Sequence, residues 1–221
     1  MKFKDAGCAT RLSAAAFRLC YNGCMDKGRL EAFSDSVIAV IITIMVLNLK
    51  VPAGGNITDL RSVGPVFCSY AFSFMFVAIY WNNHHHLLQA ATRISGGVLW
   101  ANLHLLFWLS FAPFGTAWIG AHPTEPWPCA VYGILLLLDG VAYTILARAL
   151  IKAAGPKSIL AHSIGSDPKE NLSLVIYVVA IPLAFVRTWL SGVCWMIVAF
   201  MWLLPDRRIE RVLQDEPTGE D

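Results

Sequence analysis

The sequence predicts an all-α integral membrane protein with six transmembrane helices. Of its 221 residues, 57% are hydrophobic and only 14% are charged, and the mean hydropathy is +0.57. These values are far more apolar than those of an average soluble domain. A helix needs about 20 apolar residues to cross a bilayer, so six crossings account for most of this chain and leave no room for a separate catalytic domain.

The predicted spans are apolar segments bounded by glycine, proline, charged or amide residues. In chain order they cover residues 30–49, 64–81, 97–119, 128–149, 172–187 and 188–204. Only Arg187 separates the last two. Residues 172–204 therefore form either a tight helical hairpin or one long segment in which Pro182 introduces a kink. We favour the hairpin.

The positive charges support an even number of spans. If the N-terminus is cytoplasmic, only Lys50, Arg61 and Arg187 fall on the outer side, and 14 of the 17 Lys and Arg residues lie inside. This asymmetry follows the positive-inside rule and predicts a multi-pass protein of the cell membrane with both termini cytoplasmic. We expect a cytoplasmic extension over residues 1–25, a six-helix transmembrane domain over 26–205 and an acidic cytoplasmic tail over 206–221.

Several functional classes receive no support from the sequence. The net charge of +2 is too small to indicate a nucleic-acid partner, and the six cysteines form no CxxC pair. His84, His85 and His86 are consecutive, so on a helix they point about 100° apart and cannot close on one metal ion. No HExxH or GxSxG motif is present. We therefore expect no enzyme, no cofactor and no bound metal.

The first span carries polar residues in its first turns. Arg29, Ser34 and Asp35 precede a long apolar run. An aspartate near the centre of a membrane helix costs roughly 2.5–3.5 kcal/mol and less toward the ends, so this polar set should face protein or water. Arg29 and Asp35 are about 120° apart around a helix. Each is therefore expected to find its partner on another helix.

Beyond Asp35, the residues Val40, Thr43 and Leu47 share one stripe of the predicted helix. Periodicity alone favours a packing face. The alternative is that the stripe lines a narrow pore, because branched apolar side chains can close a conduit by excluding water.

The residues of the first three spans match a known pattern. The first span reads RLEAFSD, in which Arg29, Phe33, Ser34 and Asp35 form an RxxxFSD motif. The second contains YWNNHH and the third LWANL, which include Trp81, His84 and Asn102. Over residues 25–119 the chain resembles the transmembrane protein 175 potassium channels. RxxxFSD at this position is specific, whereas the Trp-x-x-His element alone is weak.

This resemblance implies a potassium-selective, leak-like cation channel. A chain with one six-helix repeat is expected to form a homotetramer in the membrane lipid, with the first helices lining a central pore for potassium ions. The resemblance places the constriction at Val40 and Leu47, with Thr43 between them. It places the signature motif and the polar network that holds the helix at Arg29, Phe33, Ser34, Asp35, Trp81, His84 and Asn102. Val40 is smaller than the Ile or Leu common at its position.

An alternative function is a proton-coupled secondary transporter. Asp35, Asp139, His84 and His104 all fall within predicted spans, and ionisable groups in membranes often form proton relays. Inverted repeats and paired broken helices, the usual pointers to transporters, are not evident. We expect Asp139 to find a partner on another helix and His104 to be an ordinary satisfied histidine.

Overall fold

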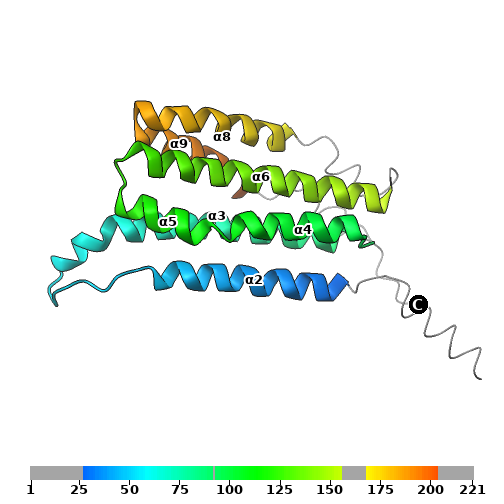
Figure 1. Cartoon of the computed structure of the whole chain (residues 1–221), viewed down its shortest axis with the longest axis horizontal. Coiled ribbons are helices and arrows are strands. Elements are labelled where there is room, and N and C mark those ends of the chain that lie inside the picture. The colour runs from blue at the N-terminus through cyan, green and yellow to red at the C-terminus, as the bar shows by residue number, and fades with distance from the viewer. Residues whose placement is uncertain (1–26, 92, 156–167, 204–221) are drawn as a thin grey trace, which may run out of the picture.

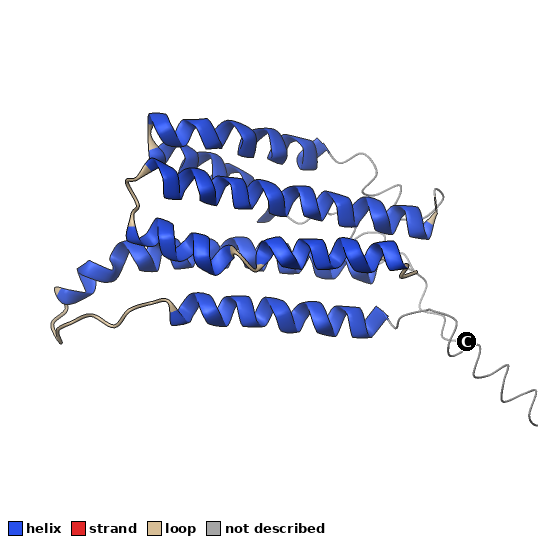
Figure 2. Cartoon of the chain, in the orientation of Figure 1, coloured by secondary structure: helices blue, strands red, loops and turns tan. Residues whose placement is uncertain are grey.

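The structure is a computed structural model that describes residues 27–91, 93–155 and 168–203. The predicted extension over 1–25 and the predicted tail over 206–221 lie outside the described residues. Within them every regular element is a helix (Figure 2). The long helices run side by side, alternately up and down, as six spans require (Figure 1).

All six predicted spans are helical. The elements in chain order are α2 (Lys27–Leu47), the 3-10 helix η1 (Asp59–Val63), α3 (Gly64–Gln89), α4 (Gly96–Leu109), α5 (Ala112–Ala121), α6 (Pro126–Ala154), α8 (Pro168–Val186) and α9 (Thr188–Leu203). Five spans are long and apolar enough to cross a membrane when α4 and α5 count as one. The sixth, α9, has 16 described residues, which is a rise of about 24 Å against a hydrocarbon core of about 30 Å.

The third span is broken, which the prediction of one segment over 97–119 did not anticipate. α4 ends at Leu109, and α5 begins at Ala112 with Pro113 in its first turn. Proline has no backbone N–H and its ring clashes with the preceding turn, so a continuous helix cannot pass through this position without distortion. The predicted extent is correct, and the predicted continuity is wrong.

The last two spans form the hairpin that the sequence favours. α8 runs through Pro182 to Val186 and α9 begins at Thr188, so Arg187 alone connects them. The hydroxyl of Ser191 donates a hydrogen bond of 2.7 Å to the carbonyl oxygen of Ala180 across the hairpin. The alternative of one long bent segment is therefore wrong.

The second span extends eight residues beyond its predicted end at residue 81. No glycine or proline interrupts the chain between Trp81 and Gln89. Leu87 and Leu88 are almost completely buried, so packing continues to stabilise the helix there. His84, His85 and His86 consequently lie inside α3 rather than in a loop after it.

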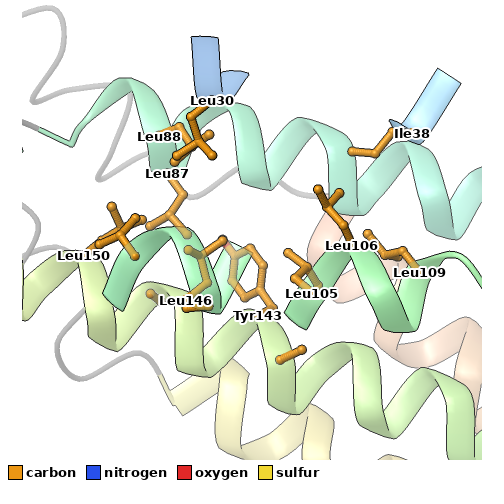
Figure 3. Packing of buried hydrophobic residues seen from close by; sticks show 14 of the residues in the cluster. Leu30, Ile38, Leu87, Leu88, Leu105, Leu106, Leu109, Tyr143, Leu146 and Leu150 are labelled. Atoms are coloured by element: carbon orange, nitrogen blue, oxygen red, sulfur yellow. The ribbon is translucent and has the colours of Figure 1, made fainter. Parts of the chain in front are cut away.

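The helices bury two apolar clusters. The first joins α2, α3, α4 and α6, and Figure 3 shows Tyr143 lying beside Leu105 and Leu146 within it. The second joins α3, α6, α8 and α9. α2 lies at one edge of the bundle and packs on α3, α4 and α5, whereas α8 lies at the opposite edge (Figure 1). Most of the surface of α2 is therefore not covered by the other described helices.

The described cations are unequally divided between the two ends of the bundle. The side-chain nitrogen of Lys27 donates to the carbonyl oxygen of Gln89 at 2.7 Å, which joins the start of α2 to the end of α3. The other described cations at that end are Arg29, Arg93, Arg148, Lys152 and Lys169. Those at the opposite end are Lys50, Arg61 and Arg187. The helical topology thus keeps the charge asymmetry of the sequence.

Candidate pore helix and the polar network behind it

α2 has one buried face. Its buried positions recur every three or four residues, so they form a single stripe toward the bundle. They are Leu30, Ser34, Ile38, Ile41 and Met45. Ser34 is the polar member of this stripe, and none of its surface is exposed.

The opposite face of α2 has no cover from the described part of the chain. Its residues follow one another in alternating steps of four and three, so that the pattern repeats every seven residues, as a spacing of 3.5 residues requires. They are Arg29, Phe33, Ser36, Val40, Thr43 and Leu47. Val40 is 56% exposed and Leu47 is 76% exposed. The three predicted constriction residues therefore share one open face, and none of the helices that the structure describes packs on it.

The two hydroxyl groups on the open face can only accept further hydrogen bonds, because their hydrogens are already bound. Ser36 donates its hydroxyl hydrogen to the carbonyl oxygen of Ala32 at 2.7 Å, and Thr43 donates to the carbonyl oxygen of Ala39 at 2.8 Å. A hydroxyl retains two lone pairs when its single hydrogen is bound. The open face thus combines apolar side chains with oxygen lone pairs, a combination that tolerates a cation.

Behind the open face, a chain of hydrogen bonds joins three helices. The amide nitrogen of Asn102 on α4 donates to the hydroxyl oxygen of Ser34 at 2.9 Å. The oxygen of the same amide lies 2.7 Å from Nε2 of His84 on α3. Because this oxygen only accepts, Nε2 of His84 is the donor. Ser34 in turn donates to the carbonyl oxygen of Leu30 at 2.9 Å, so every link has one donor and one acceptor.

A second contact joins α2 to α3 beside this network. The indole nitrogen of Trp81 donates to Oδ1 of Asp35 at 2.8 Å. The imidazole of His85 stacks on the Trp81 ring, with centroids 5.8 Å apart. Asp35 thus finds the partner on another helix that the sequence predicts.

Two predicted members of the network lie outside it. Arg29 is exposed and forms no hydrogen bond or ion pair with the described residues. Phe33 is 49% exposed. Both residues belong to the open face because their spacing from Val40 places them there, away from α3 and α4. The expectation that Arg29 pairs with another helix is not met among the helices that the structure describes.

Comparison with known proteins identifies the family. A family model described as the endosomal/lysosomal potassium channel TMEM175 matches residues 29–113. A protein named as a potassium channel, from Chryseobacterium sp. (strain P1-3), is 49% identical over 191 residues, which cover 86% of this chain and 100% of that protein. The chain belongs to the TMEM175 family. It is accordingly a multi-pass membrane protein.

Two further TMEM175 relatives come from Chamaesiphon minutus. A protein named as a potassium channel is 30% identical over 194 residues, covering 80% of this chain and 94% of that protein. The crystal structure of a TMEM175 homologue from the same species, titled as a potassium-selective channel, superimposes with a TM-score of 0.70 at 27% identity. It covers 81% of this chain and 97% of that chain. The likeness therefore includes the helices after the motif-bearing region.

Some contacts of this TMEM175 helix carry no recognisable sequence signal. At the far end of α2, the amide of Asn48 donates to the carbonyl oxygen of Pro113 at 3.5 Å. The hydroxyl of Thr116 points to the sulfur of Met45 at 3.7 Å. Both involve α5, whose position depends on the break after α4. Because this break was not predicted from the sequence, neither contact could be predicted from it.

The remaining ionisable candidates lie apart from the TMEM175 network. His104 accepts a hydrogen bond of 2.9 Å from the indole of Trp108, which confirms a satisfied histidine. Asp139 is only 4% exposed, and its Oδ1 has no hydrogen-bond partner among the described residues. Within the described residues, the expected partner of Asp139 on another helix is therefore not found. Nδ1 of His86 is likewise buried without a partner in the described part of the chain.

Proposed function

We propose that the chain is a potassium-selective, leak-like cation channel whose pore is lined by α2. The observation that carries this function is the open face of α2, which runs the length of the helix and includes Val40, Thr43 and Leu47. The bacterial relatives are named potassium channels, which supports the function independently. The family consists of ion channels rather than enzymes.

We infer that the open face packs against the α2 helices of other copies of this chain. A spacing of 3.5 residues is that of helices that wrap around one another in a left-handed bundle. The open face keeps this spacing from Arg29 to Leu47. We infer a homotetramer, in which four such faces converge on a central axis. Arg29 then lies at the mouth of the pore, where it has water or a neighbouring subunit as partner.

Within this pore, Val40 and Leu47 form the constriction and Thr43 contributes a ring of oxygens between them. Rings of branched apolar side chains exclude water from a narrow conduit, so a small change in radius has a large effect on conduction. Because the hydroxyl hydrogen of Thr43 is bound to the carbonyl oxygen of Ala39, this hydroxyl has only lone pairs to offer an ion in the pore. The same geometry lets a potassium ion exchange part of its hydration shell at this ring.

The polar network fixes the rotation of α2 about its own axis. Ser34 is bound by Asn102, and Asp35 by Trp81. A rotation of one residue, about 100°, would break both contacts and turn Val40 and Leu47 off the axis. The network thus contributes to conduction by orienting α2, and its side chains do not contact the ion.

The charge distribution supports one orientation in the cell membrane. We propose that the end carrying Lys27, Arg93 and Lys169 is cytoplasmic, since cytoplasmic loops carry the excess of Lys and Arg. Residues 1–25 and 206–221 are then cytoplasmic flanks of a channel domain over 26–205.

The function is tested by ion flux into liposomes that contain the purified full-length protein. Passive potassium flux at equal pH on both sides, larger than sodium flux and independent of a proton ionophore, is the expected result. Flux that requires a pH gradient contradicts the channel and supports the proton-coupled transporter.

The pore assignment is tested by Leu47→Ala and Val40→Ala in the same assay. Each substitution widens the constriction, so the ratio of potassium to sodium flux should fall, more for Leu47 because more volume is removed. Leu103→Ala is the matched control, because Leu103 is an exposed leucine of α4. If both pore variants keep the wild-type ratio, the constriction lies elsewhere.

A further inference from the structure

Asp139 occupies a small cavity in the half of the subunit away from α2. The cavity measures about 10 Å³, which is space for about one water molecule. Its polar lining residues come from α3 and α6. They are Ser73, Tyr80, Tyr132 and Asp139 itself. Ser73 and Tyr132 share a hydrogen bond of 2.8 Å, whereas Oδ1 of Asp139 has no partner among the described residues.

A larger cavity of about 40 Å³ adjoins this one. Phe76 and Tyr80 line both cavities, so they form the partition between them. Gly140, which follows Asp139, also lines the larger cavity, and a Cβ at this position would lie 3.8 Å from the Tyr80 hydroxyl. The Tyr80 hydroxyl therefore lies close to α6 at this level, and a Cβ on Gly140 would crowd Leu174 of α8, at 3.1 Å from its Cδ2.

The larger cavity leads toward one end of the bundle. Asn83 near the end of α3 and Glu170 in the first turn of α8 belong to its lining. Both lie toward the end of the bundle that carries Lys27, Arg93 and Lys169 (Figure 1). The larger cavity thus extends from Asn83 and Glu170 to Tyr80, and Tyr80 also lines the cavity of Asp139.

No cation of the described residues lines either cavity to neutralise Asp139. The titratable groups facing the two cavities are Tyr80 from α3, Tyr132 and Tyr143 from α6, and Tyr177 and Glu170 from α8. α4 and α5 contribute only Leu109 and Ala112, and α9 contributes Val198, Ala199 and Trp202. A buried carboxylate without a positive partner is strongly disfavoured. A proton is the smallest ligand that removes this charge.

We propose that Asp139 is a proton-binding site, occupied together with one water molecule, that exchanges its proton through the cavity reached from Glu170. The site lies outside the proposed pore and uses none of its residues. Proton binding there converts Asp139 from a lone acceptor into a hydrogen-bond donor, and the water links it to the Tyr80 hydroxyl.

Infrared spectroscopy of the full-length protein in lipid tests the protonation. The spectrum of the wild type minus that of Asp139→Asn should contain the carbonyl band of a protonated carboxyl at neutral pH, and this band should shift in D2O. If the substitution removes only ionised carboxylate bands, Asp139 is charged and the proposal is wrong. Should Asp139→Asn fail to assemble, ¹³C-aspartate labelling of the wild type replaces it. A label-sensitive protonated band at neutral pH supports the site, and its absence overturns it.

The exchange route is tested by Ala199→Leu. Ala199 lines the larger cavity and is 1% exposed, so the added carbons fill the route without reaching Asp139. The protonated band should remain while its shift in D2O becomes slower. Ile197→Leu is the matched control on the exposed side of α9. Equal exchange rates in Ala199→Leu and the wild type contradict entry by this cavity.

Discussion

The two halves of the subunit treat buried polar groups in opposite ways. Between α2, α3 and α4, the side chains of Ser34, His84 and Asn102 are buried and joined donor to acceptor. Between α3, α6 and α8, Asp139 is equally buried, yet its Oδ1 is without a partner among the described residues. A complete network fixes one arrangement of helices. The first half therefore holds its helices in one arrangement, whereas the second leaves a carboxylate oxygen available for the proton and water that we propose there.

The largest expected effect comes from breaking the complete network with Asn102→Leu. The substitution keeps the volume but leaves the N–H of His84 buried without an acceptor, which costs about 1–3 kcal/mol. We expect a lower melting temperature and less assembled channel in size-exclusion chromatography of the protein in detergent.

The double variant His84→Leu with Asn102→Leu sharpens this result. Removing both partners of a buried hydrogen bond costs much less than removing one, so the double variant should recover part of the lost stability. Leu103→Ala on the same helix serves as the control. If the double variant is as unstable as the sum of the single ones, the hydrogen bond between His84 and Asn102 is not what stabilises this region.

A smaller effect is expected from Trp81→Phe. This change removes the indole N–H that Asp35 accepts and retains most of the aromatic packing. Because Trp81 is 41% exposed within the subunit, the cost should be about 0.5–1.5 kcal/mol. Thermal unfolding monitored together with potassium flux provides the measurement. A loss as large as that of Asn102→Leu would indicate that Trp81 has a further partner in the assembled channel.

The smallest effect on stability is expected from Asp139→Asn. If Asp139 holds a proton, the amide replaces a neutral group of the same shape, and the melting temperature at neutral pH should change little, as for a substitution within about 0.5 kcal/mol. A loss comparable to that of Asn102→Leu would show that both halves hold complete networks and would remove the contrast between them.

Much of the architecture follows from apolar segments and charge, which are strong signals in a membrane. The bounds of α6 and the α8–α9 hairpin are close to those predicted. The break after Leu109 was missed because the span was counted by hydropathy, which is insensitive to Pro113. The extension of α3 was missed because its last turns mix polar residues with Leu87 and Leu88, which only tertiary packing reveals as buried.

The candidate site was predictable where the partners lie on neighbouring faces. Helical spacing puts Val40, Thr43 and Leu47 together, and the motif resemblance groups Ser34, Asp35, Trp81, His84 and Asn102. Arg29 was assigned a partner because a charge in a span usually has one, yet its spacing places it on the face that the subunit leaves open. Asp139 was assigned a partner for the same reason, and sequence alone cannot reveal a cavity.

The short hydrogen bonds from other helices hold α2 near its beginning, at Ser34 and Asp35, at 2.9 and 2.8 Å. The contacts at its far end are longer, at 3.5 Å from Asn48 to Pro113 and 3.7 Å from Thr116 to Met45. Leu47 lies 12 residues beyond Asp35, which is about 18 Å along the helix, and Val40 lies about 7.5 Å beyond it. We therefore treat α2 as a rigid helix that tilts about the region of Asp35. A tilt of about 5° moves Leu47 sideways by about 1.6 Å and Val40 by about 0.7 Å at this rise per residue. The same small rocking motion would dilate the distal ring by more than twice as much as the proximal one.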